Sequence, residues 1–374
     1  MDKAKRVLIV SASAGVGHIR AAAALEEALR EAHPDVNVEN IEALQYTNAV
    51  FRRGYRRGYN ALAAKLPSVW GYLYDTMDNR SAPRRFTRLV DRLNSRRLAK
   101  AIEQFAPDRV VCTHFFPTET FGAMRVNGRL SAPVYVTLTD YDIHAMWVQP
   151  GIDHYFVATE EMAYALKVKG VGKAKVSVTG IPIMPVFSRP FPPKPEMRQR
   201  LGLRPTATTV LLAAGGEGMV GLTPAVALLA DLREDMQLLA VAGRNEGLRK
   251  GLESAAESRR GKVAAYGFVN NMHELMAASD VIITKSGGLT VSECLAMALP
   301  MVVLKPIPGQ EERNSDYLLE NGVAIRANSP AHLVFKVRML LERGDLVARM
   351  SEAARRIARP RAAYDVAREV VAGD

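Results

Sequence analysis

Residues 283–318 read ITKSGGLTVSECLAMALPMVVLKPIPGQEERNSDYL and contain the features on which our prediction of the fold depends. A short apolar strand leads into a Gly-Gly turn and a helix that carries one glutamate. A second apolar strand then ends in a polar loop that reads Gln310-Glu311. This order is typical of a strand–helix–strand unit in a parallel sheet. The glycines would let backbone N–H groups approach a phosphate where the helix begins.

The same alternation of short apolar runs and helical stretches continues on both sides of this unit. Six prolines fall between residues 182 and 195, a composition that excludes a central strand or a helix and predicts a linker. We therefore expect an α/β protein of two doubly wound, Rossmann-like domains that face each other across a cleft. The predicted parts are residues 1–181, a linker at 182–198, a second domain at 199–350, and a C-terminal helix at 351–374 that packs back on the first domain.

The charge of this 374-residue chain is unevenly distributed. Its net charge is +11, and residues 51–100 contain 13 Lys and Arg against 3 Asp and Glu, a local net charge of +10. Such a segment attracts nucleic acid or an anionic membrane surface, and the plainer alternative is a set of solvated helix faces. No apolar run is long enough to predict a transmembrane helix. Cys112 and Cys294 lie in apolar stretches, and we expect two buried thiols in a reducing compartment.

Three glycine loops follow predicted strands. The first, SASAGVGH, ends in His18, and Arg20 occupies the position where a dinucleotide fingerprint needs its third glycine. The others read LLAAGGEGMVG and TKSGGLT, and neither continues into the Gly-Lys-Ser/Thr of a nucleotide-hydrolysing P-loop. A single loop of this kind is typical of any α/β protein. Loops in both domains favour a phosphorylated ligand held between them.

Glu293 follows Gly288 by five residues, roughly 7 Å along a helix axis. This is about the distance from the phosphates of a nucleotide to its ribose, and a carboxylate can accept hydrogen bonds from both ribose hydroxyls. The alternative is a glutamate on the helix surface, which the apolar neighbours Val291, Cys294 and Leu295 disfavour.

Together these segments resemble the two-domain GT-B glycosyltransferases that use UDP-sugars, and among them the monogalactosyldiacylglycerol synthases and processive diacylglycerol glucosyltransferases of glycosyltransferase family 28. The resemblance covers almost the whole chain. It is carried by SASAGVGHIRAAAAL, TDYDIHAMWVQPGIDHYFVATEE, GGEGMVG, YGFVNNMHELMAASDVIITKSGGLTVSECLAMALPMVV and PIPGQEERN. It implies an inverting transfer of glucose or galactose from a UDP-sugar to the 3-hydroxyl of 1,2-diacylglycerol.

The resemblance also implies a role for individual residues. His18 is the leading candidate for the base, with Asp140 second, and a histidine near its ordinary pKa can take a proton at neutral pH. The alternative for His18 is a purely structural role in the loop. The donor-binding residues implied are Gly17, Gly216, Glu217, Gly243, Asn245, Phe268, Val269, Ser286, Gly287, Gly288, Thr290, Glu293, Gln310, Glu311 and Asn314.

The family needs no cofactor and no metal, and we expect none. The sequence Asp140-Tyr141-Asp142 has the form of a metal-binding motif but lies in the acceptor-side domain. Residues 48–97 are basic and aromatic, which favours an acceptor taken from a membrane. The predicted partners are a UDP-sugar, diacylglycerol and an anionic membrane surface, without nucleic acid, for a cytoplasmic protein peripheral to the inner face of the membrane. The membrane or acceptor residues implied are Arg52, Arg53, Tyr55, Arg56, Arg57, Tyr59, Trp70 and Tyr72.

Three alternatives remain at this point. An enzyme using UDP-GlcNAc, either a peptidoglycan-type transferase or a 2-epimerase, would share the fold, and a non-catalytic nucleotide-sugar-binding protein is a third possibility. The sequence does not distinguish glucose from galactose, since these hexoses differ in one hydroxyl orientation. It also leaves open the number of sugars added and the oligomeric state.

Overall fold

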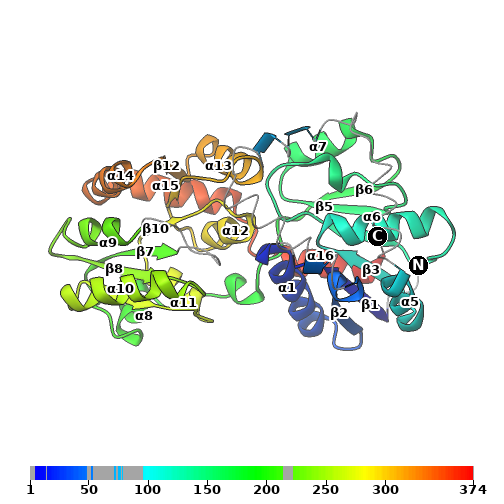
Figure 1. Cartoon of the computed structure of the whole chain (residues 1–374), viewed down its shortest axis with the longest axis horizontal. Helices are drawn as coiled ribbons and strands as arrows, with labels where there is room; N and C mark the ends of the chain where they lie inside the picture. The colour runs from blue at the N-terminus through cyan, green and yellow to red at the C-terminus, as the bar shows by residue number, and fades with distance from the viewer. Residues whose placement is uncertain are drawn as a thin grey trace. The chain divides into compact units, whose positions relative to one another are not determined.

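The computed structural model describes residues 5–13, 15–48, 96–213 and 222–373, together with Arg52, Arg53, Gly71, Tyr72, Asp75, Thr76 and Asp78. The chain divides into two compact units, each of which is built around one sheet (Figure 1). The first unit contains Met1–Pro185, Ile307–Arg313 and Arg359–Asp374, and the second contains Val186–Pro306 and Asn314–Ala358.

The first unit contains a parallel sheet of six strands in the order β2-β1-β3-β4-β5-β6. Its strands are short and mostly buried, as expected where helices cover both faces of a parallel sheet. They are β1 (Arg6–Ser11), β2 (Asn37–Glu42), β3 (Arg109–Cys112), β4 (Val134–Thr137), β5 (His154–Val157) and β6 (Lys175–Val178).

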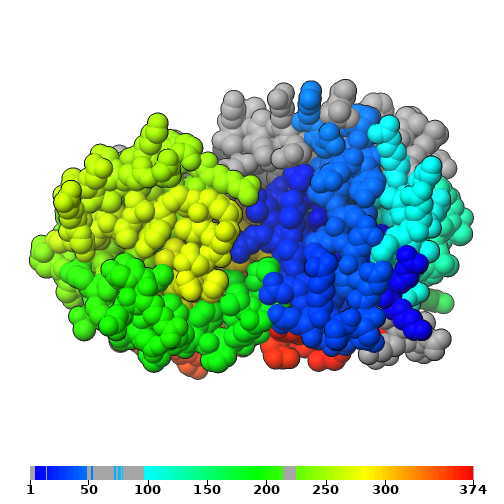
Figure 2. Space-filling view, turned by 90° about the horizontal axis from the view of Figure 1, so that it is seen from below, coloured from blue at the N-terminus to red at the C-terminus, as the bar shows by residue number. Residues whose placement is uncertain are grey.

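Two helices from opposite ends of the chain build the core on one face of this sheet. Alanines of α1 (Val16–Ala32) and of α16 (Ala362–Ala372) let the two helices approach closely above Val7 and Ile9 of β1. Figure 2 shows the surface that α1 and β2 form, in blue. The unit also contains α5 (Arg96–Phe105), α6 (Phe115–Val126), α7 (Glu160–Lys169) and the 3₁₀ turns η1 (Ala43–Tyr46) and η2 (Ala145–Trp147).

The second unit repeats this design with the strand order β12-β11-β10-β7-β8-β9, again all parallel. Its strands are β7 (Thr208–Ala213), β8 (Met236–Val241), β9 (Val263–Tyr266), β10 (Val281–Thr284), β11 (Met301–Leu304) and β12 (Ala324–Ala327). Its helical segments are η3 (Pro185–Ser188), α8 (Lys194–Arg200), α9 (Leu222–Ala230), α10 (Glu246–Ser258), α11 (Met272–Ala277), α12 (Gly288–Ala296), α13 (Gln310–Glu320), α14 (Pro330–Glu342) and α15 (Gly344–Ile357).

The predicted alternation of strands and helices is found in both units, and the α/β fold class is confirmed. The prediction that residues 182–195 exclude a helix is wrong at its end. Helix α8 begins at Lys194, and Pro195 stands in its first turn, where the missing N–H has no helical partner to lose. The C-terminal stretch is interrupted at Ala358–Arg361, around Pro360, so residues 351–374 span parts of two helices.

A further prediction from composition agrees with the structure. Cys112 and Cys294 are both buried free thiols. Among the described residues, no helix combines the length and the apolar character that crossing a membrane requires.

Candidate active site

The strand orders indicate where each unit binds a ligand. β1 lies between β2 and β3, and β7 lies between β8 and β10, so later strands of each unit are added on both sides of its first strand. In open parallel sheets, ligands bind beyond the carboxyl ends of the strands at this switch point. The residues after β1 and β3, and those after β7 and β10, are therefore the candidates.

His18 lies at the switch point of the first unit. It stands in the first turn of α1 and is buried, with 8% of its surface exposed. Its Nδ1 is 2.8 Å from the carbonyl oxygen of Thr113, directly after β3, and 3.0 Å from Oγ1 of Thr139, after β4. The Thr113 hydroxyl donates to the His18 carbonyl at 3.0 Å. Residues that follow two strands, β3 and β4, thus fix the imidazole ring.

These contacts determine the tautomer of His18. A carbonyl oxygen only accepts hydrogen bonds, so Nδ1 must carry the proton, and Nε2 keeps its lone pair. Burial lowers the pKa of His18 from 6.5 to about 4, and the hydrogen bond to Thr113 offsets part of that effect. The prediction of an ordinary histidine pKa is therefore wrong. The ring is neutral at pH 7 and presents Nε2 as a proton acceptor.

A second histidine lies against the first. The rings of His18 and His114 are 4.4 Å apart and inclined by 75°. The backbone N–H of Phe116 donates to Nδ1 of His114 at 3.0 Å, which places the proton of His114 on Nε2. Burial, and to a smaller extent the charge that His18 can carry, lower the pKa of His114. Both rings are therefore kept neutral.

Asp140 follows Thr139 and lies close in sequence to the His18 contacts. Its Oδ1 accepts a hydrogen bond from Nε2 of Gln310 at 3.4 Å, and both residues belong to the first unit. The carboxylate of Glu311 accepts the backbone N–H of Ile307 at 2.9 Å. Gln310 and Glu311, predicted to hold the sugar, are thus engaged by protein groups in this structure.

In the second unit, the turn after β10 and the start of α12 form the counterpart site. Ser286 is buried, and the side-chain amide of Asn314 donates to its carbonyl at 2.9 Å, which fixes the turn. Helix α12 begins at Gly288, and no side chain caps its N-terminus. The first N–H groups of such a helix have no helical partner and, with the helix dipole, favour an anion.

Glu293 lies on the next turns of α12 and is 1% exposed. The alternative of a glutamate on the helix surface is therefore wrong. Burial, and to a smaller extent the charge of Glu293, raise the pKa of the neighbouring Cys294 thiol. Thr290, on the same helix, is half-buried.

The remaining described donor residues surround the ends of β8 and β9. Asn245 caps α10 by accepting the N–H of Leu248 at 2.9 Å, and Gly243 adopts a positive φ of 62° in the preceding turn. Phe268 is 60% exposed, and the guanidinium of Arg244 lies 4.8 Å from the centre of its ring. Val269 is half-buried. This exposed arginine–phenylalanine pair provides a flat surface on which a base could stack.

Sequence reasoning missed four of these residues: Arg244, Thr113, His114 and Thr139. Each stands directly after a strand or within the turn that follows one, so the rule that ligands bind at carboxyl strand ends could have found them. The sequence motifs drew attention to glycines instead.

Several predicted residues lie outside the described part of the chain. For others, the structure gives little beyond their exposure. Gly216 and Glu217, after β7, lie outside it, as do Tyr55, Arg56, Arg57, Tyr59 and Trp70. Gly17 is half-buried in the first turn of α1. Of the predicted membrane residues that are described, Arg53 and Tyr72 are exposed and Arg52 is half-buried.

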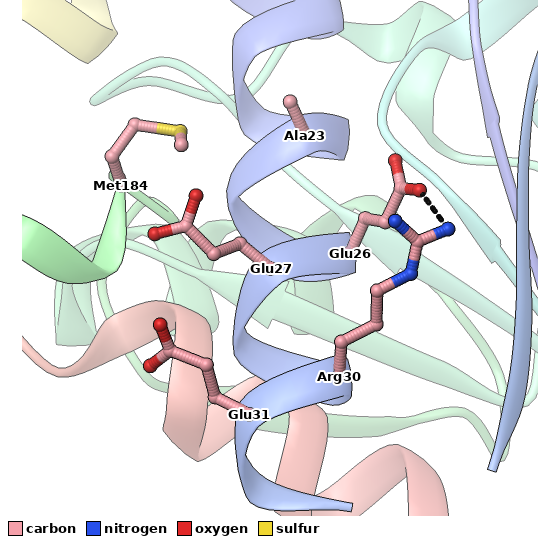
Figure 3. Close-up of a pocket in the computed structure, with 6 residues that line it drawn as sticks. All are labelled: Ala23, Glu26, Glu27, Arg30, Glu31 and Met184. Carbon is pink, nitrogen blue, oxygen red and sulfur yellow. Dashed lines mark ion pairs between the residues drawn. The ribbon is translucent and has the colours of Figure 1, made fainter. Parts of the chain in front are cut away.

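A hollow of about 390 Å³ lies along α1, away from the predicted site residues (Figure 3). It is lined by Glu26, Glu27, Glu31, Arg30 and Met184, and Arg30 pairs with Glu26 at 2.6 Å. Its net negative charge is unsuited to a diphosphate. Among the residues that the structure describes, no cluster of histidine, cysteine and carboxylate side chains could hold a metal ion.

Gly287 offers a direct test of the predicted phosphate site. A Cβ atom placed on Gly287 meets nothing within 4 Å, and its φ of −69° suits any residue, so Gly287→Ala should fold normally. If a phosphate contacts this turn, the added methyl group takes its space, and we expect the Kd for UDP to rise at least tenfold with an unchanged Tm. Gly322→Ala, where φ is 67°, is the opposite control: it should lower Tm and leave UDP affinity unchanged. A Gly287→Ala protein that binds UDP like wild type would contradict the assignment.

Comparison with known proteins agrees with this geometry. Residues 18–183 match the family described as monogalactosyldiacylglycerol (MGDG) synthase, and residues 193–357 match glycosyl transferases group 1. The processive diacylglycerol beta-glucosyltransferase of Bacillus subtilis (strain 168) is 30% identical over 94% of this chain and 91% of its own. That of Bacillus cereus (strain AH820) is 28% identical over 100% of this chain and 95% of its own.

Solved structures with the same fold include UDP-GlcNAc 2-epimerase from Neisseria meningitidis bound to UDP-GlcNAc, with a TM-score of 0.64 and 17% identity over 99% of this chain and 100% of that one. Acinetobacter baumannii MurG matches with a TM-score of 0.63 and 14% identity over 98% and 99% of the two chains. The two doubly wound units therefore define a GT-B fold. The chain belongs to the family of the processive diacylglycerol β-glucosyltransferases.

Proposed function

We propose that this protein is an inverting glycosyltransferase that transfers glucose from UDP-glucose to the 3-hydroxyl of 1,2-diacylglycerol. The observation that carries the proposal is the 30% identity, over 94% of the chain, to a relative named as a diacylglycerol β-glucosyltransferase. The choice of glucose over galactose rests on the names of such relatives, since the family matched by the first unit is named for galactose.

The second unit supplies the groups for the donor. The uncapped N-terminus of α12 and the Ser286–Gly287 turn provide backbone N–H groups for the diphosphate. The buried carboxylate of Glu293 would accept hydrogen bonds from the ribose hydroxyls, and the Phe268–Arg244 pair would receive the base. Gln310 and Glu311, which belong to the first unit, would release their protein partners to bind hexose hydroxyls.

The first unit supplies the base. Neutral His18 takes the proton of the acceptor hydroxyl on Nε2 while Thr113 holds Nδ1–H. The acceptor oxygen forms a bond to the anomeric carbon as the bond to the UDP oxygen breaks, so an α-linked donor gives a β-linked product. UDP leaves with the electron pair, and the N-terminus of α12 stabilises its charge. In this proposal, Asp140 acts near the acceptor and is the second candidate for the base.

A lipid product assay tests the proposal. The protein is incubated with dispersed dioleoylglycerol and, in parallel, UDP-glucose or UDP-galactose, and the products are identified with their anomeric configuration. We expect β-glucosyl diacylglycerol in the first reaction and at least tenfold less product in the second. A galactolipid as main product would overturn the choice of hexose. Epimerisation of UDP-GlcNAc incubated alone would overturn the transferase.

We also propose that the basic segment around residues 51–100 binds the inner face of the cytoplasmic membrane. Each basic residue near an anionic surface contributes about 1 kcal/mol, and the segment carries a net charge of +10. We expect the protein to sediment with vesicles of phosphatidylglycerol and much less with phosphatidylcholine, and this difference should shrink as salt rises, because screening shortens the Debye length to about 3 Å at 1 M.

Neutralising Arg52, Arg53, Arg56 and Arg57 together to Gln should reduce both vesicle binding and activity on bilayer lipid, and should spare activity on detergent-dispersed lipid. The matched control removes the same charge from the surface of α15 and the residue before it, by changing the exposed Arg343, Arg349, Arg355 and Arg356 to Gln. Equal effects of the two quadruple changes would show that vesicle binding depends only on the total charge of the protein, which would contradict a specific role of the basic segment.

A further inference from the structure

One loop of the first unit carries the two residues proposed to bind the hexose. Residues 307–313 belong to this unit, whereas β11 before them and the rest of α13 after them belong to the second. Gln310 and Glu311 lie in this loop, and their contacts with Asp140 and with the backbone of Ile307 have to be released before they can bind a sugar. Other groups are therefore needed to hold the loop while they do so.

Arg313, at the end of this loop, lies among three carboxylates. Its Nη1 is 2.5 Å from Oδ2 of Asp142 and 3.7 Å from Oδ2 of Asp78, and its Nη2 is 2.9 Å from Oδ1 of Asp75. All four residues belong to the first unit. An isolated ion pair on a protein surface contributes little to stability, but a planar guanidinium shared by several carboxylates forms a network of fixed geometry.

Asp78 is a firm anchor point for this network. It accepts the backbone N–H of Ala145 at 2.6 Å and a hydrogen bond from Nζ of Lys169 at 3.0 Å. Burial acts to raise the pKa of Asp78, but these hydrogen bonds and the charges nearby outweigh it and hold that pKa below its usual range. Asp78 is therefore ionised at neutral pH. Loss of the Arg313 guanidinium would leave the carboxylates close together, and their repulsion would favour a displaced loop.

The start of the loop is held by close packing. A Cβ atom placed on Gly71 would lie 2.7 Å from Cβ of Pro308, so the backbone at Gly71 packs directly against this proline. Pro308 and Arg313 thus fix the two ends of the loop. The sequence Asp140-Tyr141-Asp142, which has the form of a metal-binding motif, contributes Asp142 to this anchorage.

We propose that Arg313 is a positioning residue that fixes the 307–313 loop on the first unit, so that Gln310 and Glu311 stand where the hexose of the donor binds. The inference rests on the proposed function and deepens it, because it adds a residue that holds the two sugar-binding side chains. Asp142 gains a role as the principal anchor of Arg313. Arg313 itself would not contact UDP, since the groups proposed for the diphosphate, the ribose and the base belong to the second unit.

Calorimetry with UDP and with UDP-glucose, each without acceptor, tests this role. In Arg313→Gln we expect the Kd for UDP-glucose to rise about tenfold and the Kd for UDP to stay within about twofold of wild type. Arg313→Lys keeps the charge and should recover part of the affinity for UDP-glucose. Arg129→Gln is the matched control, because it removes an exposed arginine of the same unit that pairs with Glu103, and it should change neither Kd.

A double-mutant cycle tests the anchor. Asp142→Asn should raise the Kd for UDP-glucose in the same way. The double variant Asp142→Asn/Arg313→Gln should be little weaker than Arg313→Gln alone, because both changes remove the same contact. Equal weakening of UDP and UDP-glucose in Arg313→Gln would overturn the inference, since it would show a general effect on the fold. A lower Kd for UDP-glucose would also overturn it, because the anchored loop would then block the hexose.

Gln310→Ala separates the inference from the proposed function. It removes a side chain proposed to contact the sugar, so it should raise the Kd for UDP-glucose whatever holds the loop. If Gln310→Ala weakens the binding of UDP-glucose and Arg313→Gln does not, the positioning role is overturned and the sugar site stands. If neither change affects UDP-glucose, the loop does not bind the hexose, and this part of the proposed function fails together with the inference.

Discussion

Replacing His18 by Asn should lower kcat by about 10²–10⁴-fold, which is the usual contribution of a general base. Asparagine is the informative change, because its amide can still donate to the Thr113 carbonyl, as Nδ1 does in wild type, while the acceptor nitrogen Nε2 is lost. UDP affinity, measured by calorimetry, should be unchanged, since the proposed diphosphate groups lie in the second unit. Turnover within a few-fold of wild type would make His18 structural, and Asp140 would then be the base to test.

The acid side of the pH profile should distinguish a buried histidine from an ordinary one. With a pKa of about 4, His18 stays neutral down to about pH 5, so kcat/KM should be nearly constant from pH 8 to 5.5. A histidine of pKa 6.5 would lose about tenfold over the same range.

Folding stability should decrease on the acid side of neutrality. His18 and His114 have lowered pKa values when folded, so below pH 6.5 the unfolded state binds more protons than the folded state. Stability should therefore fall as pH drops from 6.5 towards 4. Circular dichroism at each pH measures the folded fraction, so a loss of activity caused by unfolding can be separated from one caused by protonation of His18. A tenfold fall of kcat/KM between pH 8 and 5.5 in fully folded protein would contradict a pKa of about 4 for His18.

Glu293→Gln should raise the Kd for UDP by about 10–100-fold. The change removes a charge at nearly constant volume, and hydrogen bonds to a charged group contribute about 1.5–3 kcal/mol. Comparison with 2′-deoxy-UDP identifies the ligand group involved. Wild type should bind UDP more tightly than 2′-deoxy-UDP. The variant should lose most of this difference in affinity, because the Glu293→Gln change and the missing 2′-hydroxyl group remove the same interaction.

Glu320→Gln, at the exposed end of α13, is the matched control and should change neither affinity. If Glu293→Gln weakens UDP and 2′-deoxy-UDP equally, the carboxylate supports the fold of α12 and does not contact the ribose. Unchanged affinity for both nucleotides would remove Glu293 from the donor site.

The positions of the strands were predictable, and the states of the site residues were not. Runs such as VLIV and MVVL are apolar at every position, which is the pattern of strands covered on both faces, so they predict strands without tertiary information. The burial of Glu293 was also partly readable from its apolar neighbours. By contrast, the environment of His18 is built by Thr113, His114 and Thr139, about a hundred residues further along the chain. No local pattern reports the pKa that results.

The loop at 307–313 shows a different limit. Its composition suggested a sugar site, but composition does not reveal which groups a flexible polar side chain contacts. In the structure, Gln310 donates to Asp140 and Glu311 caps its own loop. The proline-rich stretch illustrates the same limit for backbone rules, since Pro195 disfavours a helix interior and suits a first turn, and only the position of the helix start distinguishes the two cases.

The contribution of α16 to the first unit delays the completion of that unit during protein synthesis. Ala363, Val366, Ala367, Val370 and Val371 are almost fully buried against α1 and the first sheet, yet the chain reaches them only after the strands and helices of the second unit. At about 5–20 residues per second, translation from β6 to α16 takes about 10–40 s. For that time the nascent first unit exposes the apolar face that α16 covers in the folded protein. A stalled or truncated chain would therefore be a substrate for chaperones and proteases, even with all six strands of its first sheet complete.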